Sequence, residues 1–406
     1  MQISKCFLIF FWAMLPVFSD DWPGFGGMEG TFKSYEDNLK KTWEKKVPQK
    51  LWELEVGLGF SSIIESKGLA YTQGYANGRN TLYCVDVTDG KIIWKSAFPC
   101  SKADDYFKGG SRTTPLVSDG NLYLSTHMGD VYCINSQNGN ISWSLNISDD
   151  LDGRRPTWGY AASPVVIDQK LILVTGAPQA ALIALNKLTG EILWKNGHYG
   201  AAYSTPKRYN NSDQILVFHE SGLSLHSLLD GSEKSFYQHK TRYGINAAQP
   251  LEVDSRVLLS SAYGKGSALI RFSGKTGKVE WKSEKVATQM ASLIHDEGFI
   301  YGIHGQAGAR SRFSTIFCMD NQNGRIIWEK KGYGLGSLIM VGNTLILLNE
   351  SGELVLVDAN PNQFTEIASF QVLSGKDNWI PPSYANGRLH CRSSDGTWVC
   401  LQLGAM

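Results

Sequence analysis

The stretch DVYCINSQNGNISW, residues Asp130 to Trp143, contains the pattern that decides the fold of this chain. An alternating apolar strand ends in Asn135, a turn supplies Gly139, and Trp143 follows four residues later. The same pattern recurs as LYCVDVTDGKIIW (82–94), LIALNKLTGEILW (182–194), LIRFSGKTGKVEW (269–281) and IFCMDNQNGRIIW (316–328). Copies of one pattern along most of a sequence indicate an internal repeat.

The spacing of these copies indicates the architecture. The repeated glycines lie at positions 90, 139, 190, 277 and 324, and the double-length gap after 190 holds a degenerate copy with Gly231 in register and Phe236 roughly where the Trp is expected. Repeats of about 40 to 50 residues with several short strands each are typical of a β-propeller, a ring of four-stranded blades. Each unit exposes an apolar face that only its neighbour covers, so we expect a closed ring.

A second recurring feature, a small-residue motif before the first strand of each unit, predicts the number of units. One residue from each copy is Ser62, Thr114, Ser163, Thr205, Gln249, Ser292, Ser337 and Pro382. We therefore predict an all-β fold, an eight-bladed propeller of four-stranded blades. The last unit lacks an outermost strand, whereas Leu51–Val56 has the composition of one and no blade of its own. We expect this N-terminal strand to complete the last blade and close the ring, because closure removes an unpaired edge.

The N-terminus has the features of an exported protein. Lys5 precedes an apolar run from Cys6 to Phe18, and Val17 to Ser19 form an acceptable cleavage site. An uncleaved N-terminal anchor is the alternative, and a lipid-anchored cysteine is not expected because Cys6 precedes the apolar run. We predict a signal peptide at 1–19, an N-terminal arm at 20–46 and the propeller at 47–406, in the periplasm or at the cell surface. No later segment is apolar for long enough to span a membrane.

Composition narrows the partners of the mature chain. The 406 residues have a formal net charge of +1 and no long run of like charge, which argues against nucleic acid as a partner. In the arm, Trp22 and Phe25 of the sequence DWPGFGG (21–27) are expected to pack on the outside of the ring.

The last hairpin raises the question of a disulfide. Asp395–Gly396 predicts a two-residue type I′ turn, which places Cys391 opposite Cys400 in a close, non-hydrogen-bonded pair. Either a disulfide or two buried free thiols fits that position. The remaining cysteines form no CxxC motif and no His/Cys cluster, so no metal site is predicted.

The repeated tryptophans are interpreted as packing residues between blades, since they recur at one place in each unit. They are Trp94, Trp143, Trp194, Trp281 and Trp328. No metalloprotease, nucleophile-elbow, phosphate-loop or dinucleotide-binding motif is present, so no catalytic residues are predicted.

These features together resemble a known family. The strand ending in Asp or Asn, followed by a turn with Gly and then Trp, is similar to the repeat of the pyrroloquinoline quinone-like (PQQ-like) β-propeller proteins of bacterial envelopes. DWPGFGG, GLGFSS (57–62) and GRLHCRSSDGTWVCL (387–401) strengthen the resemblance, which covers roughly Leu51 to Leu403. It implies a fold similar to that of the outer-membrane protein assembly factor propeller, a non-enzymatic scaffold. It also includes quinoprotein dehydrogenases, which sandwich the quinone between a Trp and a disulfide of adjacent cysteines beside Ca²⁺, but no adjacent cysteines exist here.

The residues just before each small-residue motif are expected to rim the mouth of the central funnel. They are Phe60, Arg112, Trp158, Tyr160, Tyr203, Asn246, Gln289 and Trp379. Aromatic faces beside Arg and amides suit a ligand or partner, while a simple plug of the funnel is the alternative. The outer strands near Phe236 and near Phe364 to Phe370 are expected to offer edges for strand addition.

The function predicted from the sequence is that of a non-catalytic, exported scaffold without cofactor that binds an envelope protein or a polymer. The alternatives are a PQQ- and calcium-dependent periplasmic dehydrogenase and a carbohydrate-binding propeller.

Overall fold

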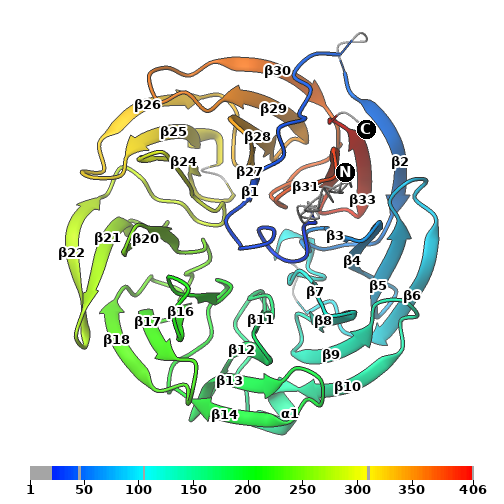
Figure 1. Cartoon of the computed structure of the whole chain (residues 1–406), viewed down its shortest axis with the longest axis vertical. Coiled ribbons are helices and arrows are strands. Elements are labelled where there is room, and N and C mark those ends of the chain that lie inside the picture. The colour runs from blue at the N-terminus through cyan, green and yellow to red at the C-terminus, as the bar shows by residue number, and fades with distance from the viewer. Residues whose placement is uncertain (1–20, 44–46, 104–105, 309–310, 405–406) are drawn as a thin grey trace, which may run out of the picture.

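The strands of the computed structural model form a ring of antiparallel blades around a central axis (Figure 1). The structure describes residues 21–43, 47–103, 106–308 and 311–404, so the predicted signal peptide at 1–19 lies outside the described residues. Within these ranges the strands form eight four-stranded groups, numbered here as blades 1 to 8. The predicted propeller fold is confirmed.

In each blade the first strand lies nearest the axis and the fourth lies at the periphery (Figure 1). Blade 1 comprises β3 (Ile64–Ser66), β4 (Leu69–Ala76), β5 (Arg79–Asp86) and β6 (Ile92–Pro99), and blade 2 comprises β7 (Leu116–Ser118), β8 (Asn121–Ser125), β9 (Asp130–Asn135) and β10 (Ile141–Asn146). Blade 3 comprises β11 (Val165–Ile167), β12 (Lys170–Ala177), β13 (Ala180–Asn186) and β14 (Ile192–Asn196), and blade 4 comprises β15 (Lys207–Arg208), β16 (Gln214–His219), β17 (Gly222–Ser227) and β18 (Glu233–Gln238). Blades 5 to 8 comprise β19 (Leu251–Val253), β20 (Arg256–Ser261), β21 (Gly266–Ser273) and β22 (Thr276–Ser283); β23 (Ile294–Asp296), β24 (Phe299–His304), β25 (Thr315–Asp320) and β26 (Ile326–Lys331); β27 (Gly336–Val341), β28 (Thr344–Asn349), β29 (Glu353–Asp358) and β30 (Glu366–Gln371); β31 (Ser383–Ala385), β32 (Arg388–Arg392), β33 (Thr397–Gln402) and β2 (Gln49–Glu55).

The helical elements are short. They are α1 (Ile147–Leu151), η1 (Tyr106–Lys108) and η2 (Ser311–Phe313) in the described part of the chain. In those same ranges no helix has both the length and the apolar character that crossing a membrane requires.

The repeated tryptophans lie between neighbouring blades. The indole N–H of Trp143 donates to Lys187 O of the next blade (3.1 Å), and a Cβ on Gly190 of that blade would lie 2.8 Å from the indole ring. The same indole-to-carbonyl bond is made by Trp94, Trp194, Trp281 and Trp328. Glycine is needed in these turns because it has φ near +75° and the neighbouring ring leaves no room for a side chain.

The N-terminal strand closes the ring, as the sequence predicts. β2 pairs antiparallel with β33, with Trp52 opposite Cys400. Trp52 also supplies the inter-blade tryptophan that blade 8 otherwise lacks, because its indole donates to Val87 O of blade 1 (2.8 Å) and its ring covers Gly90. One strand therefore removes the open edge and provides the packing contact.

The arm lies across the central channel, and the expectation that it packs on the outside of the ring is wrong (Figure 1). Trp22 pairs with Glu65 of blade 1, and β1 (Lys33–Ser34) adds parallel to the inner strand β27 of blade 7. Trp22 and Phe32 are each 2% exposed. Gly26 and Gly27 fold the arm back so tightly that a Cβ on either would lie about 3 Å from the ring of Phe32 or Trp22.

The predicted pairing of Cys391 with Cys400 is also wrong. Ser393 N donates to Thr397 O (2.9 Å), which leaves three residues in the turn instead of two and places Cys391 opposite Val399. A shift of one residue moves a side chain to the other face of the sheet. Cys391 and Cys400 therefore face opposite sides of the blade as free thiols.

The edge predicted at Phe236 is not fully open either. Blades 4 and 5 join into one continuous sheet through β18 and β22, where Phe236 pairs with Thr276. By register, the residue in the repeat Trp position of blade 4 is Ser235, which lies opposite Leu225, and not Phe236.

Candidate functional site

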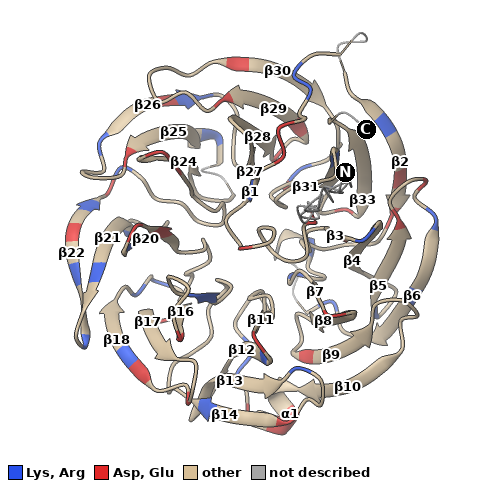
Figure 2. Ribbon diagram, in the orientation of Figure 1, with Lys and Arg blue, Asp and Glu red and all other residues tan. Residues whose placement is uncertain are grey.

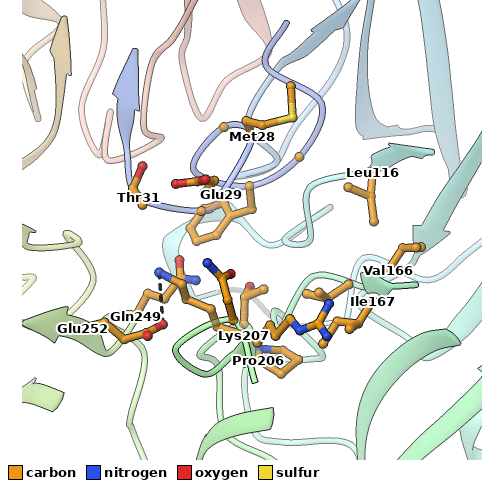
Figure 3. Close-up of a pocket in the computed structure, with 18 of the residues that line it drawn as sticks. Met28, Glu29, Thr31, Leu116, Val166, Ile167, Pro206, Lys207, Gln249 and Glu252 are labelled. Carbon is orange, nitrogen blue, oxygen red and sulfur yellow. Dashed lines mark ion pairs between the residues drawn. The ribbon is translucent and has the colours of Figure 1, made fainter. Parts of the chain in front are cut away.

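A cavity of about 530 Å³ lies between the arm and the inner strands of the ring, and we call it the arm cavity (Figure 3). The arm contributes Met28, Glu29 and Thr31. The inner walls contribute Leu116 from blade 2, Val166 and Ile167 from blade 3, Pro206 and Lys207 from blade 4, and Gln249 and Glu252 from blade 5. The arm is bonded to blades 1, 2, 6, 7 and 8, and the cavity lies where it passes over the inner walls of blades 3 to 5.

Most charged groups that line the arm cavity are already paired. Lys207 Nζ lies 3.5 Å from Glu252 Oε1, the pair dashed in Figure 3, and Asn210 N donates to the other Glu252 oxygen (2.7 Å). Lys33 of the arm pairs with Asp296 of blade 6 at 2.6 Å.

Gln249, a neutral residue in this wall, has a side-chain oxygen without a partner. It is 6% exposed, and its Oε1 is buried with no hydrogen-bond partner among the described residues. A buried amide oxygen without a donor is unfavourable, so a ligand N–H or O–H at this point would be stabilised. The arm cavity therefore combines paired charges with one buried amide oxygen that lacks a hydrogen-bond partner.

The residues predicted to rim the funnel divide into separate groups. Phe60 stacks on Trp379 (ring centroids 5.8 Å apart, 17° between planes), and the Arg112 guanidinium lies 5.5 Å from the Phe60 ring centre. Trp158 and Tyr203 form a second contact, edge to face at 5.9 Å. Phe60, Arg112, Trp158 and Tyr203 are half-buried, whereas Trp379 is 6% exposed.

The other three predicted rim residues are held by structural hydrogen bonds. Tyr160 is 3% exposed and donates its hydroxyl to Thr175 O (3.1 Å). Asn246 is fully buried and donates to the carbonyls of His219 and His239. Gln289 donates to the Tyr263 hydroxyl and accepts from Ala307 N. The structure thus does not bring all eight predicted residues into one site.

An apolar surface that sequence reasoning missed lies on the periphery of blades 1 to 4. Exposed aliphatic side chains occur at the start of the outermost strand or in the turn before it, and we call them the aliphatic arc: Ile92, Ile93, Ile141, Leu188, Ile192, Leu193 and Leu229. Leu188 is 55% exposed and Leu229 is 81% exposed. The strand β10 in this region carries no charged residue (Figure 2).

In blades 1 to 3, five members of the arc lie one or two positions before the half-buried Trp94, Trp143 or Trp194. Exposed aliphatic side chains close to aromatic rings are a feature of many protein interfaces. The signal in the sequence is the apolar residue at one or both of the two positions before each Trp, where an exposed outer strand is expected to carry polar residues.

Two features expected of a quinone and calcium site, adjacent cysteines and a cluster of metal-ligating side chains, can be looked for among the described residues. No group of three or more His, Cys, Asp or Glu side chains in the described ranges is placed to hold a metal ion. The sequence contains no adjacent cysteines, and the six cysteines in the described ranges are free.

Comparison with known proteins gives relatives of two kinds. A protein described as outer membrane protein assembly factor BamB, from Kangiella koreensis, is 24% identical over 211 residues, a match that spans 51% of this chain and 49% of the relative. The quinoprotein alcohol dehydrogenase PedH of Pseudomonas putida is 21% identical over 216 residues, which span 52% of this chain and 28% of that enzyme.

A solved structure shares the fold. BamB from Moraxella catarrhalis superposes with a TM-score of 0.63 at 14% sequence identity, over 88% of this chain and all of that one. The sequence pattern of the family described as outer membrane protein assembly factor BamB matches residues 42–156 and 78–330, which is well over half of the chain. This protein therefore belongs to the BamB family of PQQ-like β-propellers.

Proposed function

We propose that this protein is a non-catalytic, exported propeller that binds a partner in the cell envelope and acts as a scaffold in outer-membrane protein assembly. The observation that carries the proposal is the aliphatic arc, a set of exposed aliphatic side chains that recurs at the periphery of four consecutive blades. Docking of a partner protein there would bury aliphatic and indole surface, the usual source of affinity at protein interfaces.

The proposal is supported by the relatives whose description names outer-membrane protein assembly. A quinoprotein dehydrogenase activity is disfavoured by the residues themselves, because neither the adjacent cysteines nor a cluster of metal-ligating side chains is present in the described ranges. A net charge of +1 offers no reason for nucleic acid to be the partner.

The aromatic groups Phe60–Trp379 and Trp158–Tyr203 keep a carbohydrate ligand as the second candidate, because aromatic faces beside polar groups suit sugar rings. A panel of glycans titrated against the wild type and an Arg112→Ala variant tests this candidate. Equal responses of the two proteins remove Arg112 from any such site.

Photo-crosslinking in the native envelope tests the scaffold proposal. A photoreactive amino acid at position 188 or 193 should give a discrete crosslinked product with one envelope protein. The control is position 279 on β22, where Val279 occupies in blade 5 the repeat position of Ile192 and is 40% exposed but lies outside the arc. The same product from all three positions, or none from 188 and 193, would contradict docking on the arc.

A further inference from the structure

The seam between blades 4 and 5 differs from the seams that a tryptophan fills. Ser235 stands in the repeat Trp position, four residues after Gly231. Its hydroxyl donates to Gly274 O, three residues before Gly277, which is the carbonyl position that the indole uses in other seams. The hydrogen bond is therefore kept, but the bulk of the indole is missing.

Two features occupy this seam in place of the ring. β18 and β22 approach closely enough for Phe236 N to donate to Lys275 O (3.1 Å). Farther along the same seam lies a second cavity of about 380 Å³, lined by Tyr237, Gln238, His239, Lys240, Lys265, Ser267, Ala268 and Lys282. We call it the lysine pocket.

Three lysines from separate segments line the lysine pocket. Lys240 follows β18, Lys265 lies in the turn between β20 and β21, and Lys282 lies near the end of β22. Glu220 Oε1 lies 4.0 Å from Lys240 Nζ, and water screens this pair because both side chains are well exposed. In the described ranges, no carboxylate forms an ion pair with Lys265 or Lys282. The positive charge around the pocket is therefore largely uncompensated, and like charges held together repel.

A buried imidazole without a partner lies in the wall of the same pocket. His239 is 8% exposed, and its Nε2 is buried with no hydrogen-bond partner among the described residues. Its main chain is held on both sides, because His239 N donates to Ser221 O and His239 O accepts from Asn246. Burial, followed by the charges of Lys265 and Lys282, lowers the pKa of His239 to about 4. The ring is thus neutral near pH 7 and adds no charge of its own to the pocket.

Protection of strand edges does not explain this arrangement. Lysines on an outer strand discourage aggregation, and Lys275 and Lys278 beside or on β22 suit that role. Lys240 and Lys265 lie outside the outer strands, in segments that border the pocket. An unpaired imidazole in the wall has no function at a strand edge.

We propose that the lysine pocket binds a phosphate-bearing anion, with the three lysines supplying positive charge and the neutral His239 ring forming part of the wall. A phosphate group offers several strong acceptor oxygens for converging ammonium donors, and charge-assisted hydrogen bonds are the strong ones. A free phosphate ester and a lipid headgroup share this chemistry. This site is independent of the aliphatic arc, which lies on blades 1 to 4.

Calorimetric titration with inorganic phosphate at pH 7 and low salt tests the proposal. The wild type should bind with a stoichiometry near one per chain. The double variant Lys265→Ala/Lys282→Ala should bind at least about tenfold more weakly, while Lys278→Ala on the same outer strand should bind within about twofold of the wild type. All three lysines are exposed, so these variants should fold normally.

A second titration separates the two sources of phosphate. Soluble short-chain phosphatidylglycerol that binds more tightly than inorganic phosphate, with the same loss in the double variant, identifies a lipid headgroup as the ligand; weaker binding identifies a free phosphate group. Absence of saturable phosphate binding in the wild type, or equal affinity of the wild type and the double variant, overturns the proposal.

Discussion

The junction that closes the ring contains a buried charged cluster, and replacing Glu65 by Gln should strongly destabilise the protein. Glu65 lies on β3 of blade 1 with a fully buried side chain. Its carboxylate pairs with Arg388 and lies 2.9 Å from His390 Nε2, both on β32 of blade 8, and it accepts from Asn386 Nδ2 (3.0 Å). Trp398 donates its indole N–H to His390 Nδ1 (3.2 Å), so the imidazole proton that faces Glu65 is on Nε2.

The expected loss of stability follows from the burial of this ion pair. The Glu65→Gln variant keeps the shape but removes the negative charge, which leaves Arg388 without its counter-charge in a site where its side chain is only 18% exposed. Removing one partner of a buried ion pair costs about 3–5 kcal/mol. With an unfolding entropy of roughly 2 cal/mol/K per residue, the melting temperature should fall by about 4–6 °C for a chain of this length.

Differential scanning calorimetry measures this change at pH 7. The control is Glu53→Gln on β2. The Glu53 carboxylate pairs with Lys50 at the surface (side chains 44% and 57% exposed), so this substitution should lower the free energy of unfolding by less than about 1 kcal/mol. A Glu65→Gln variant that melts within about 1 °C of the wild type would refute the assigned role of the cluster in ring closure.

The stability difference between the wild type and Glu65→Gln should also depend on pH. Burial alone raises the pKa of Glu65, but the hydrogen bonds and charges of His390 and Arg388 outweigh it and hold the pKa below the usual value of 4.5. A carboxylate with a lowered pKa stabilises the fold above its unfolded pKa and loses that contribution as pH falls through the folded value. The difference between wild type and Glu65→Gln should therefore be full at pH 7 and shrink below pH 4.5.

Three further predictions concern the seams, the thiols and the histidines. Gly231→Ala should destabilise the fold by at least about 2 kcal/mol in urea unfolding, because the new Cβ would lie 2.5 Å from the Trp194 ring at φ +70°; Gly264→Ala, at φ +78° with open space around it, is the control for backbone strain alone and should cost about 1 kcal/mol. Denaturation without reductant should allow alkylation of both Cys391 and Cys400, as mass spectrometry would detect, and a protected pair would contradict the register of the last hairpin. His219 stacks on Tyr199 (ring centroids 3.7 Å apart), and burial, then the charge of His226, lowers the pKa of His219 to about 3. A histidine with a lowered pKa binds its proton more readily in the unfolded chain, so the free energy of unfolding should fall as pH drops below 6.5. A His219→Gln variant whose free energy of unfolding changes with pH as steeply as that of the wild type would contradict this assignment.

The repeat explains why so much of the fold could be predicted from the sequence. The Gly-to-Trp spacing identifies the turn and the outer strand of each unit, and the unpaired strand at Leu51–Val56 has no place except in the last blade. Hydrophobic alternation and turn chemistry are local signals, and the structure confirms the elements that depend on them.

The features that escaped prediction depend on contacts distant in sequence. Nothing local shows that Trp22 of the arm pairs with Glu65 inside the channel. One extra residue in the turn before Thr397 changes the register and separates Cys391 from Cys400, although Asp395–Gly396 is typical of a shorter turn.

The two sites argued from the structure were hidden for the same reason. The lysines of the pocket come from three segments of two blades, and Gln249 meets its cavity only because the arm folds back over it. The aliphatic arc alone left a local signal, the apolar residues that precede each Trp of blades 1 to 3.

The most direct test of the scaffold account is calorimetric titration of the mature protein with pyrroloquinoline quinone in the presence of Ca²⁺. The account predicts no saturable binding, because the described residues provide neither a metal-ligating cluster nor the adjacent cysteines that would sandwich the quinone. Tight binding of one quinone per chain would contradict it and would place a redox cofactor in a propeller that we interpret as a binding scaffold.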